Sequence, residues 1–95
     1  MTGALARIGA ALGAPGSFTP WIALRGTFNV SVSGGWAGTL TLQRSFDGGA
    51  TVMDVEAITA NIERLGDEPE RGVLYRVGFK PGDHASGAAT VRISQ

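Results

Sequence analysis

The sequence predicts an all-β protein: a small antiparallel β-sandwich or barrel of about six to seven strands with an extended N-terminal arm. Two observations support this fold class. After Trp21, apolar and polar residues alternate with a period of two, as in strands that bury one face. Glycine-rich turns separate these alternating segments. No internal repeat indicates a solenoid or a propeller.

The alternation locates three strands in the first half of the domain. They cover residues 25–33, residues 38–46 and, less regularly, residues 50–58. The turn at 47–49 reads Asp-Gly-Gly, and these residue types tolerate the positive φ angles that a hairpin loop requires. The apolar residues of these strands are Phe28, Val30, Val32, Leu40, Leu42, Phe46, Val52, Met53, Val55 and Ile58.

The second half continues the pattern. Residues 59–65 fit either a short strand or one helical turn, and we favour the strand. An exposed acidic loop at 66–70 precedes the most regular strand, 73–79, and a turn at 81–83 precedes the last one, 89–93. The alternating apolar residues here are Val73, Tyr75, Val77, Phe79, Ala89, Val91 and Ile93.

Residues 1–20 differ from the rest in composition, so we predict an arm at 1–20 and a single β domain at 21–95. The arm is rich in Gly and Ala and carries one charge, at Arg7. Leu5, Ile8 and Leu12 have helix-like spacing, but the intervening glycines make a helix marginal in isolation. Two interpretations remain open: an arm that orders against another molecule, and a frayed terminus.

The composition excludes several classes of function. Eight acidic residues balance eight basic ones in 95 residues, so we expect no nucleic-acid partner and no membrane partner. The sequence has no cysteine, which excludes disulfides and thiolate chemistry. No segment has the length of a membrane span or the pattern of a secretory signal. All basic residues except Lys80 are Arg, which fits interface contacts and equally a GC-rich genome.

The sequence also offers no convincing catalytic set, so we predict no enzyme, no cofactor and no metal site. The single histidine, His84, is near Asp83 and Ser86, but neighbours within one short turn seldom reach the geometry of a triad. One histidine does not supply the three or four ligands that zinc needs. The acidic residues of 67–70 fit a solvated loop better than a catalytic carboxylate pair. We therefore expect binding or assembly instead of turnover.

One local motif resembles the Asp-box, S-x-D-x-G-x-T-W, a β-hairpin signature of sialidases and other β proteins. Ser45, Asp47, Gly49 and Thr51 match it, and Val52 replaces the usual tryptophan. In that family the aspartate fastens the turn and has a structural role. The resemblance implies a hairpin here and not glycan cleavage, because a sialidase propeller needs repeated blades.

Three longer segments, residues 34–49, 72–76 and 91–95, resemble small β-rich proteins encoded among the virion genes of tailed bacteriophages. The resemblance extends over the chain apart from the N-terminal arm. Such proteins are usually structural, and several are capsid decoration (cement) proteins. The resemblance therefore implies a protein made in the host cytoplasm and located on the capsid exterior. Its implied partners are the major capsid protein and further copies of itself, as a homotrimer.

A cement protein needs a stiff module and a broad contact surface, and aromatic and arginine side chains tend to concentrate binding energy. On this basis we select apolar residues of the arm together with aromatic residues and arginines near it. The predicted interface residues are Leu5, Ile8, Leu12, Phe18, Trp21, Arg25, Trp36 and Arg44. For Trp36 a second interpretation stays open, in which the indole caps the core at a hairpin end.

Two other functions remain open. The first is another virion component, such as a tail or head–tail connector protein. The second is a glycan-binding β-sandwich for host attachment, which requires an exposed aromatic platform. Trp36 and Tyr75 are the candidates for that platform.

Overall fold

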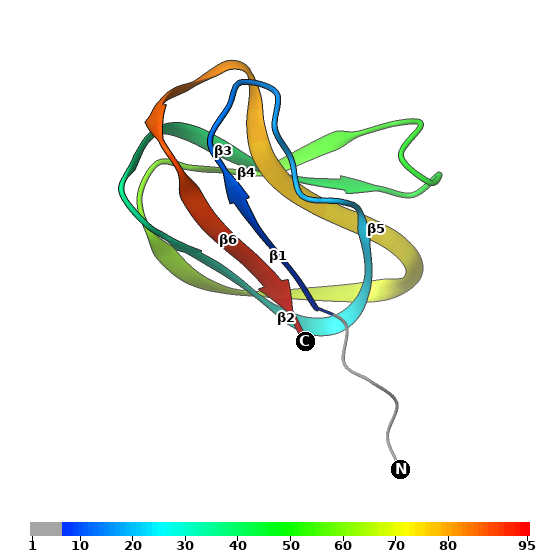
Figure 1. Ribbon diagram of the computed structural model, residues 1–95. Helices are drawn as coiled ribbons and strands as arrows, with labels where there is room; N and C mark the ends of the chain where they lie inside the picture. Colours follow the sequence, from blue (N-terminus) through cyan, green and yellow to red (C-terminus); the bar gives the residue numbers. More distant parts are fainter. Residues whose placement is uncertain (1–6) are drawn as a thin grey trace.

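The computed structural model describes residues 7–95, which form a single antiparallel sheet and contain no helix, hence none that could span a membrane. The strand order is β1-β6-β2-β5-β3-β4, so β1 and β4 are the edges (Figure 1). The all-β class is thereby confirmed, whereas neither a sandwich nor a barrel is, because the strands form one open sheet. The strands are β1 (Arg7–Leu12), β2 (Ile22–Ser33), β3 (Trp36–Ser45), β4 (Met53–Ile58), β5 (Ile62–Gly87) and β6 (Ala89–Ser94).

The longest strand, β5, connects the two halves of the sheet. Its residues 62–75 pair with β2, and its residues 74–87 pair with β3. The strand bends along its length, so the sheet curls around its own core (Figure 1). The predictions of an acidic loop at 66–70 and of a turn at 81–83 are wrong, because both segments lie within this strand. The register with β2 shifts between Leu24 and Gly26, and this shift accommodates the extra residues of β5.

The core consists of the inward-facing side chains of the alternating segments, and most predicted core residues are confirmed. They are Phe28, Val30, Val32, Leu40, Leu42, Ile58, Val73, Tyr75, Val77, Phe79, Ala89, Val91 and Ile93, none more than 4% exposed. The prediction is wrong for Phe46, which is 48% exposed, and three other apolar residues of this region, Val52, Met53 and Val55, are 36–46% exposed. These four residues lie at or beyond the ends of β3 and β4 or on β4, which is an edge strand with a partner on one side only.

Much of the segment expected to form the arm belongs to the sheet and its packing. β1 pairs with β6 from Arg7↔Ser94 to Leu12↔Ala89. Residues 17–19 then run beside the second half of β5. The Phe79 amide donates a hydrogen bond to the Ser17 carbonyl at 2.8 Å, and the Thr19 amide donates one to the Val77 carbonyl at 2.9 Å. The helical spacing is not realised, because pairing with β6 and β5 satisfies these backbone groups instead.

Gly78 allows this close approach of residues 17–19 to β5. A Cβ atom at Gly78 would lie 2.2 Å from the Ser17 carbonyl oxygen and 2.5 Å from the Phe18 Cα. We therefore expect Gly78→Ala to lower the free energy of unfolding by about 1–3 kcal/mol, the range for overpacking. Urea denaturation measures the loss. Gly35→Ala is the control, because no atom lies within 4 Å of a Cβ there; equal losses in the two variants would contradict the explanation.

Candidate interaction surface

The β3–β4 hairpin carries most of the exposed large apolar side chains in residues 7–95. Four of the five lie on it, namely Phe46, Val52, Met53 and Val55, and we call these four the hairpin surface. The fifth, Leu65, lies in the half of β5 that pairs with β2. Exposed apolar groups that gather in this way mark sites of interaction with other molecules.

The loop of this hairpin is fastened by the Asp-box-like residues. The Ser45 hydroxyl oxygen accepts a hydrogen bond from the Gly49 amide at 2.8 Å, and it donates to the Asp47 carboxylate at 2.8 Å. The same carboxylate oxygen accepts from the Thr51 amide at 2.8 Å. The backbone and side chain of Thr51, followed by the Ser45 hydroxyl, lower the pKa of Asp47 to about 2. The motif thus has the structural role that its resemblance implied.

A buried carboxylate supports the base of the hairpin. Glu68 is 1% exposed, and its Oε1 accepts hydrogen bonds from Arg44 Nη2 at 2.7 Å and from the Tyr75 hydroxyl at 2.6 Å. Its Oε2 accepts from the Glu70 amide at 3.1 Å. The Arg44 guanidinium in turn lies 4.6 Å from the ring centroid of Phe46, within cation–π distance. Arg44 therefore supports the Phe46 ring, and the ion pair with the buried Glu68 holds Arg44 in place.

The electrostatics of this cluster keep Glu68 ionised. Burial alone would raise the pKa of Glu68, but the hydrogen bonds from Tyr75 and Glu70 and the Arg44 charge outweigh burial, so the pKa is lowered. Burial and the bond to Glu68 raise the pKa of Tyr75 to about 12. At neutral pH the cluster is thus an ion pair with a neutral phenol. Among the described residues, Arg44 Nε is the one buried side-chain polar atom without a hydrogen-bond partner.

A second arginine fastens the N-terminal segment to the opposite face of β3. The Arg76 guanidinium lies 4.1 Å from the ring centroid of Phe18 and 4.5 Å from that of Trp21. Its Nε donates to Gln43 Oε1 at 2.9 Å. Burial lowers the pKa of Arg76. This stack ties residues 18–21 to the sheet.

Gln43 and Trp21, which both contact Arg76, also contact β4 and the hairpin loop, respectively. Gln43 Nε2 donates to Asp54 Oδ1 at 2.9 Å, and Lys80 forms an ion pair with Asp54, so β4 is tied to β3 and β5. The Trp21 indole packs on the loop, because a Cβ at Gly49 would lie 3.0 Å from its Nε1. The β3–β4 hairpin is therefore supported on one face by Arg44 and on the other by Trp21, Gln43 and Lys80.

The structure brings three predicted interface residues near the hairpin and separates the others. Arg44 lies beneath Phe46, Trp21 packs on the loop, and Phe18 shares Arg76 with Trp21. Arg25 is exposed on β2 and belongs to a different group of residues, the one that lines a shallow hollow with Arg71 and Gln95.

The remaining predicted interface residues have different surroundings. Leu12 is 4% exposed and is part of the core, so its expected role as an anchor in a partner groove does not fit this conformation. Ile8 packs partly against the same core, and Leu5 lies outside the described residues. Trp36 donates from Nε1 to Asn61 Oδ1 at 2.7 Å and packs edge-on against Phe79, which fits the capping interpretation.

The structure also shows the surroundings of the residues considered for a glycan platform, a catalytic triad and a metal site. Tyr75 is 4% exposed, so Trp36 and Tyr75 do not form an exposed aromatic platform. The His84 ring packs against Phe79, and its Nε2 lies 2.7 Å from the Gly87 carbonyl oxygen. Within residues 7–95, no three His, Asp or Glu side chains converge as metal ligands would.

Sequence reasoning missed Glu68 and the exposure of the hairpin surface. Glu68 has acidic neighbours in an apparently solvated stretch, and no local signal distinguishes it from Asp67 or Glu70. Comparisons with protein-family models, curated proteins and solved structures find no match to this chain. The functional argument therefore starts from the surfaces themselves.

The Glu68 cluster leads to a stability prediction. Glu68→Gln removes the charge that faces the partly buried Arg44, so we expect a loss of about 3 kcal/mol in the free energy of unfolding at pH 7. Because the folded pKa of Glu68 lies below its ordinary value of 4.5, its contribution is complete above that pH. It disappears as the pH falls through the folded value.

Urea denaturation across pH measures this effect, and the difference between wild type and Glu68→Gln should shrink in acid. The exposed Glu70→Gln is the matched control. A loss as large in Glu70→Gln, or a pH-independent loss in Glu68→Gln, would show that the ion pair is not the cause.

The Asp47 turn leads to a local prediction. Asp47→Ala removes the acceptor of the Thr51 amide, so exchange of that amide hydrogen should become faster. In the wild type the protection should be complete above pH 3.8, the ordinary value, and should fall as the pH approaches about 2. Hydrogen exchange followed by NMR measures both. Asp67→Ala, on β5, should leave the Thr51 amide unchanged.

Proposed function

We propose that this protein is a capsid decoration (cement) protein. In this proposal the hairpin surface adheres to the outer surface of the major capsid protein lattice and stabilises the head. The observation that carries the proposal is a group of exposed apolar side chains held on a hairpin that is braced on both faces. The resemblance to small virion proteins supports the same function.

The bracing matters because binding costs entropy when a loop must be ordered. Here the Ser45 and Asp47 hydrogen bonds order the loop, and Arg44 supports Phe46 before any partner arrives. A contact surface that is ordered in advance retains more of its apolar burial as net affinity. A protein that must hold neighbouring shell subunits under load benefits from such a stiff surface.

The edge position of β4 adds a second kind of contact. β4 pairs with β3 on one side, and among the described residues no strand pairs with its other side. An exposed edge offers backbone donors and acceptors, and Val55 and Met53 provide apolar area beside them. We propose that the capsid subunit contacts this edge together with Phe46, and that three copies of the protein associate on the shell.

Binding to expanded capsids that lack the protein tests the proposal. We expect the wild type to bind in many copies and to raise the temperature at which the capsids melt. Phe46→Ser should weaken binding about thirtyfold, the effect of losing a contact worth about 2 kcal/mol. Val55→Ser tests the surface at a residue of β4 that takes no part in the Arg44–Glu68 ion pair or in the contact between Arg44 and Phe46.

Leu65→Ser is the matched control, since Leu65 is 73% exposed and lies on β5, where it pairs with Asn29 of β2 and not with the hairpin. Failure of the wild type to bind would reject the proposal. Equal loss in Leu65→Ser and Phe46→Ser would reject the hairpin as the contact. A few copies at one vertex, instead of many over the shell, would assign the protein to the head–tail connector.

A further inference from the structure

A second surface lies along β2, and the function proposed above does not use it. β2 pairs with β5 from Ile22 to Val32, but β6 covers its other side only from Asn29 to Ser33. Among the described residues, 22–28 therefore have a strand partner on one side only. We call the uncovered side the β2 edge. Unpaired edges of this kind are templates for an additional strand.

The side chain of Gln95 shows that this edge accepts donors. Its Nε2 donates to the Arg25 carbonyl at 2.6 Å and to the Thr27 carbonyl at 3.3 Å. Gln95 follows β6 directly, so its amide stands where the backbone N–H groups of a strand collinear with β6 would stand. The Gln95 amide is easily displaced from this edge, because a backbone segment that takes its place can donate the same two hydrogen bonds and form further ones.

Two shallow hollows lie along the β2 edge and share Gln95. The first is basic, and it is lined by Ala23, Leu24, Arg25, Arg71, Gly72 and Gln95. The second is mainly apolar, and it is lined by Thr27, Phe28, Asn29, Leu65, Ser94 and Gln95. The edge thus offers a different chemistry at each of its two ends.

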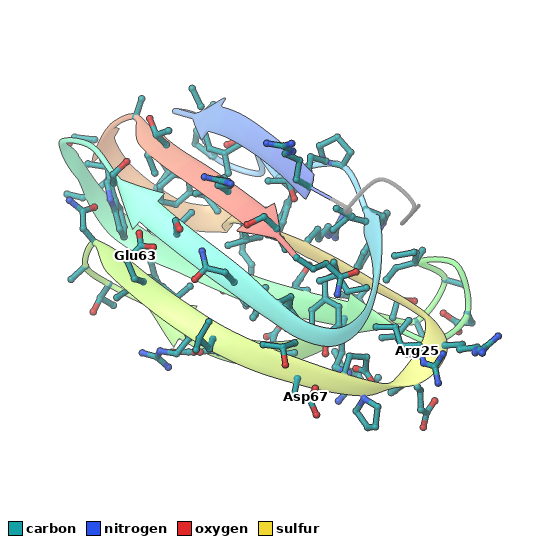
Figure 2. The ribbon with its side chains drawn as sticks, turned by 90° about the horizontal axis from the view of Figure 1, so that it is seen from below. Arg25, Glu63 and Asp67 are labelled. Atoms are coloured by element: carbon teal, nitrogen blue, oxygen red, sulfur yellow. The ribbon has the colours of Figure 1, made fainter. Side chains whose placement is uncertain are left out.

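The charges give this edge a direction. Arg25 and Arg71 are exposed, and neither forms an ion pair with a described residue. Figure 2 shows Arg25 at one end of this side of the molecule, with Asp67 and then Glu63 farther along β5. An acidic ligand group is therefore attracted near Arg25 and Arg71, and it is repelled near Asp67, which pairs with Thr27 at the other end of the uncovered residues.

From these observations we infer that the β2 edge binds an extended, acidic peptide segment of a partner protein by strand addition. The segment runs in the direction of β6, antiparallel to β2. An apolar residue occupies the hollow beside Leu65, and acidic residues farther toward its C-terminus face Arg25 and Arg71. Main-chain hydrogen bonds to β2 provide affinity, and the arginine pair provides the preference for carboxylates.

Fluorescence anisotropy with synthetic peptides tests the inference. The probe is an acetylated, fluorescein-labelled octapeptide with valine and threonine alternating in its first half and glutamate and threonine in its second half. Two further probes have the reversed sequence or lysine in place of glutamate. We expect the first probe to bind about tenfold or more tightly than either of the others, and to weaken as salt increases.

Variants locate the site. Arg25→Glu and Arg71→Glu should each weaken binding at least about tenfold, because each reverses a charge at the basic hollow. Gln95→Ala should leave binding unchanged or tighten it, because its amide no longer competes for the Arg25 and Thr27 carbonyls. Arg92→Glu is the control, since Arg92 is an exposed arginine that forms no ion pair with a residue of 7–95 and lines neither hollow. Bound peptide should also slow amide exchange within residues 23–28.

Several outcomes would overturn the inference. They are no binding of the glutamate probe, equal binding of the lysine probe, equal loss in Arg92→Glu, or lost binding in Gln95→Ala. A dimer in sedimentation that Arg25→Glu dissociates would replace the peptide with a contact between two copies of the protein. The hairpin variants Phe46→Ser and Val55→Ser should not change peptide binding, so this test and the capsid test fail independently.

Discussion

The pairing of one strand, β5, with both halves of the sheet is the constraint on which the rest of the structure depends. β5 pairs first with β2 and then with β3, and the core residues Val73, Tyr75, Val77 and Phe79 lie on it. The change of partner leaves one side of its second half open, and residues 17–19 bond there. The curl of the sheet follows from this strand, because no other described strand pairs with both halves over such a length.

The irregular register of β5 explains why a charge is buried in so small a domain. Opposite the shift between Leu24 and Gly26, Glu68 is directed inward, where it meets Tyr75 and Arg44. A lone buried carboxylate would be costly, and three donors offset that cost. Arg44 extends the cluster to Phe46, so an irregularity in the middle of the sheet determines the support of the exposed hairpin.

The strands and the core could be predicted because alternation reports directly which face of a strand is buried, as at Phe28, Val30 and Val32. The edges could not, because Val52, Met53 and Val55 have the residue types of buried positions and are exposed only through the place of β4 in the sheet. Arg44 and Trp21 were selected from residue type as interface residues, and the structure places both against the β3–β4 hairpin. Glu68 depends on a register shift, and the β2 edge depends on where β6 stops, and neither is a local property of the sequence.

The pairing of β1 with β6 has a consequence for how the molecule forms. Arg7 lies opposite Ser94, so segments near the two limits of the described chain must meet before the sheet is complete. Contacts between residues so distant in sequence slow folding, because a large loop has to close first. During synthesis on the ribosome, β1 leaves the exit tunnel before its neighbour β6 does, so the two strands pair only after residues 89–94 have also been translated.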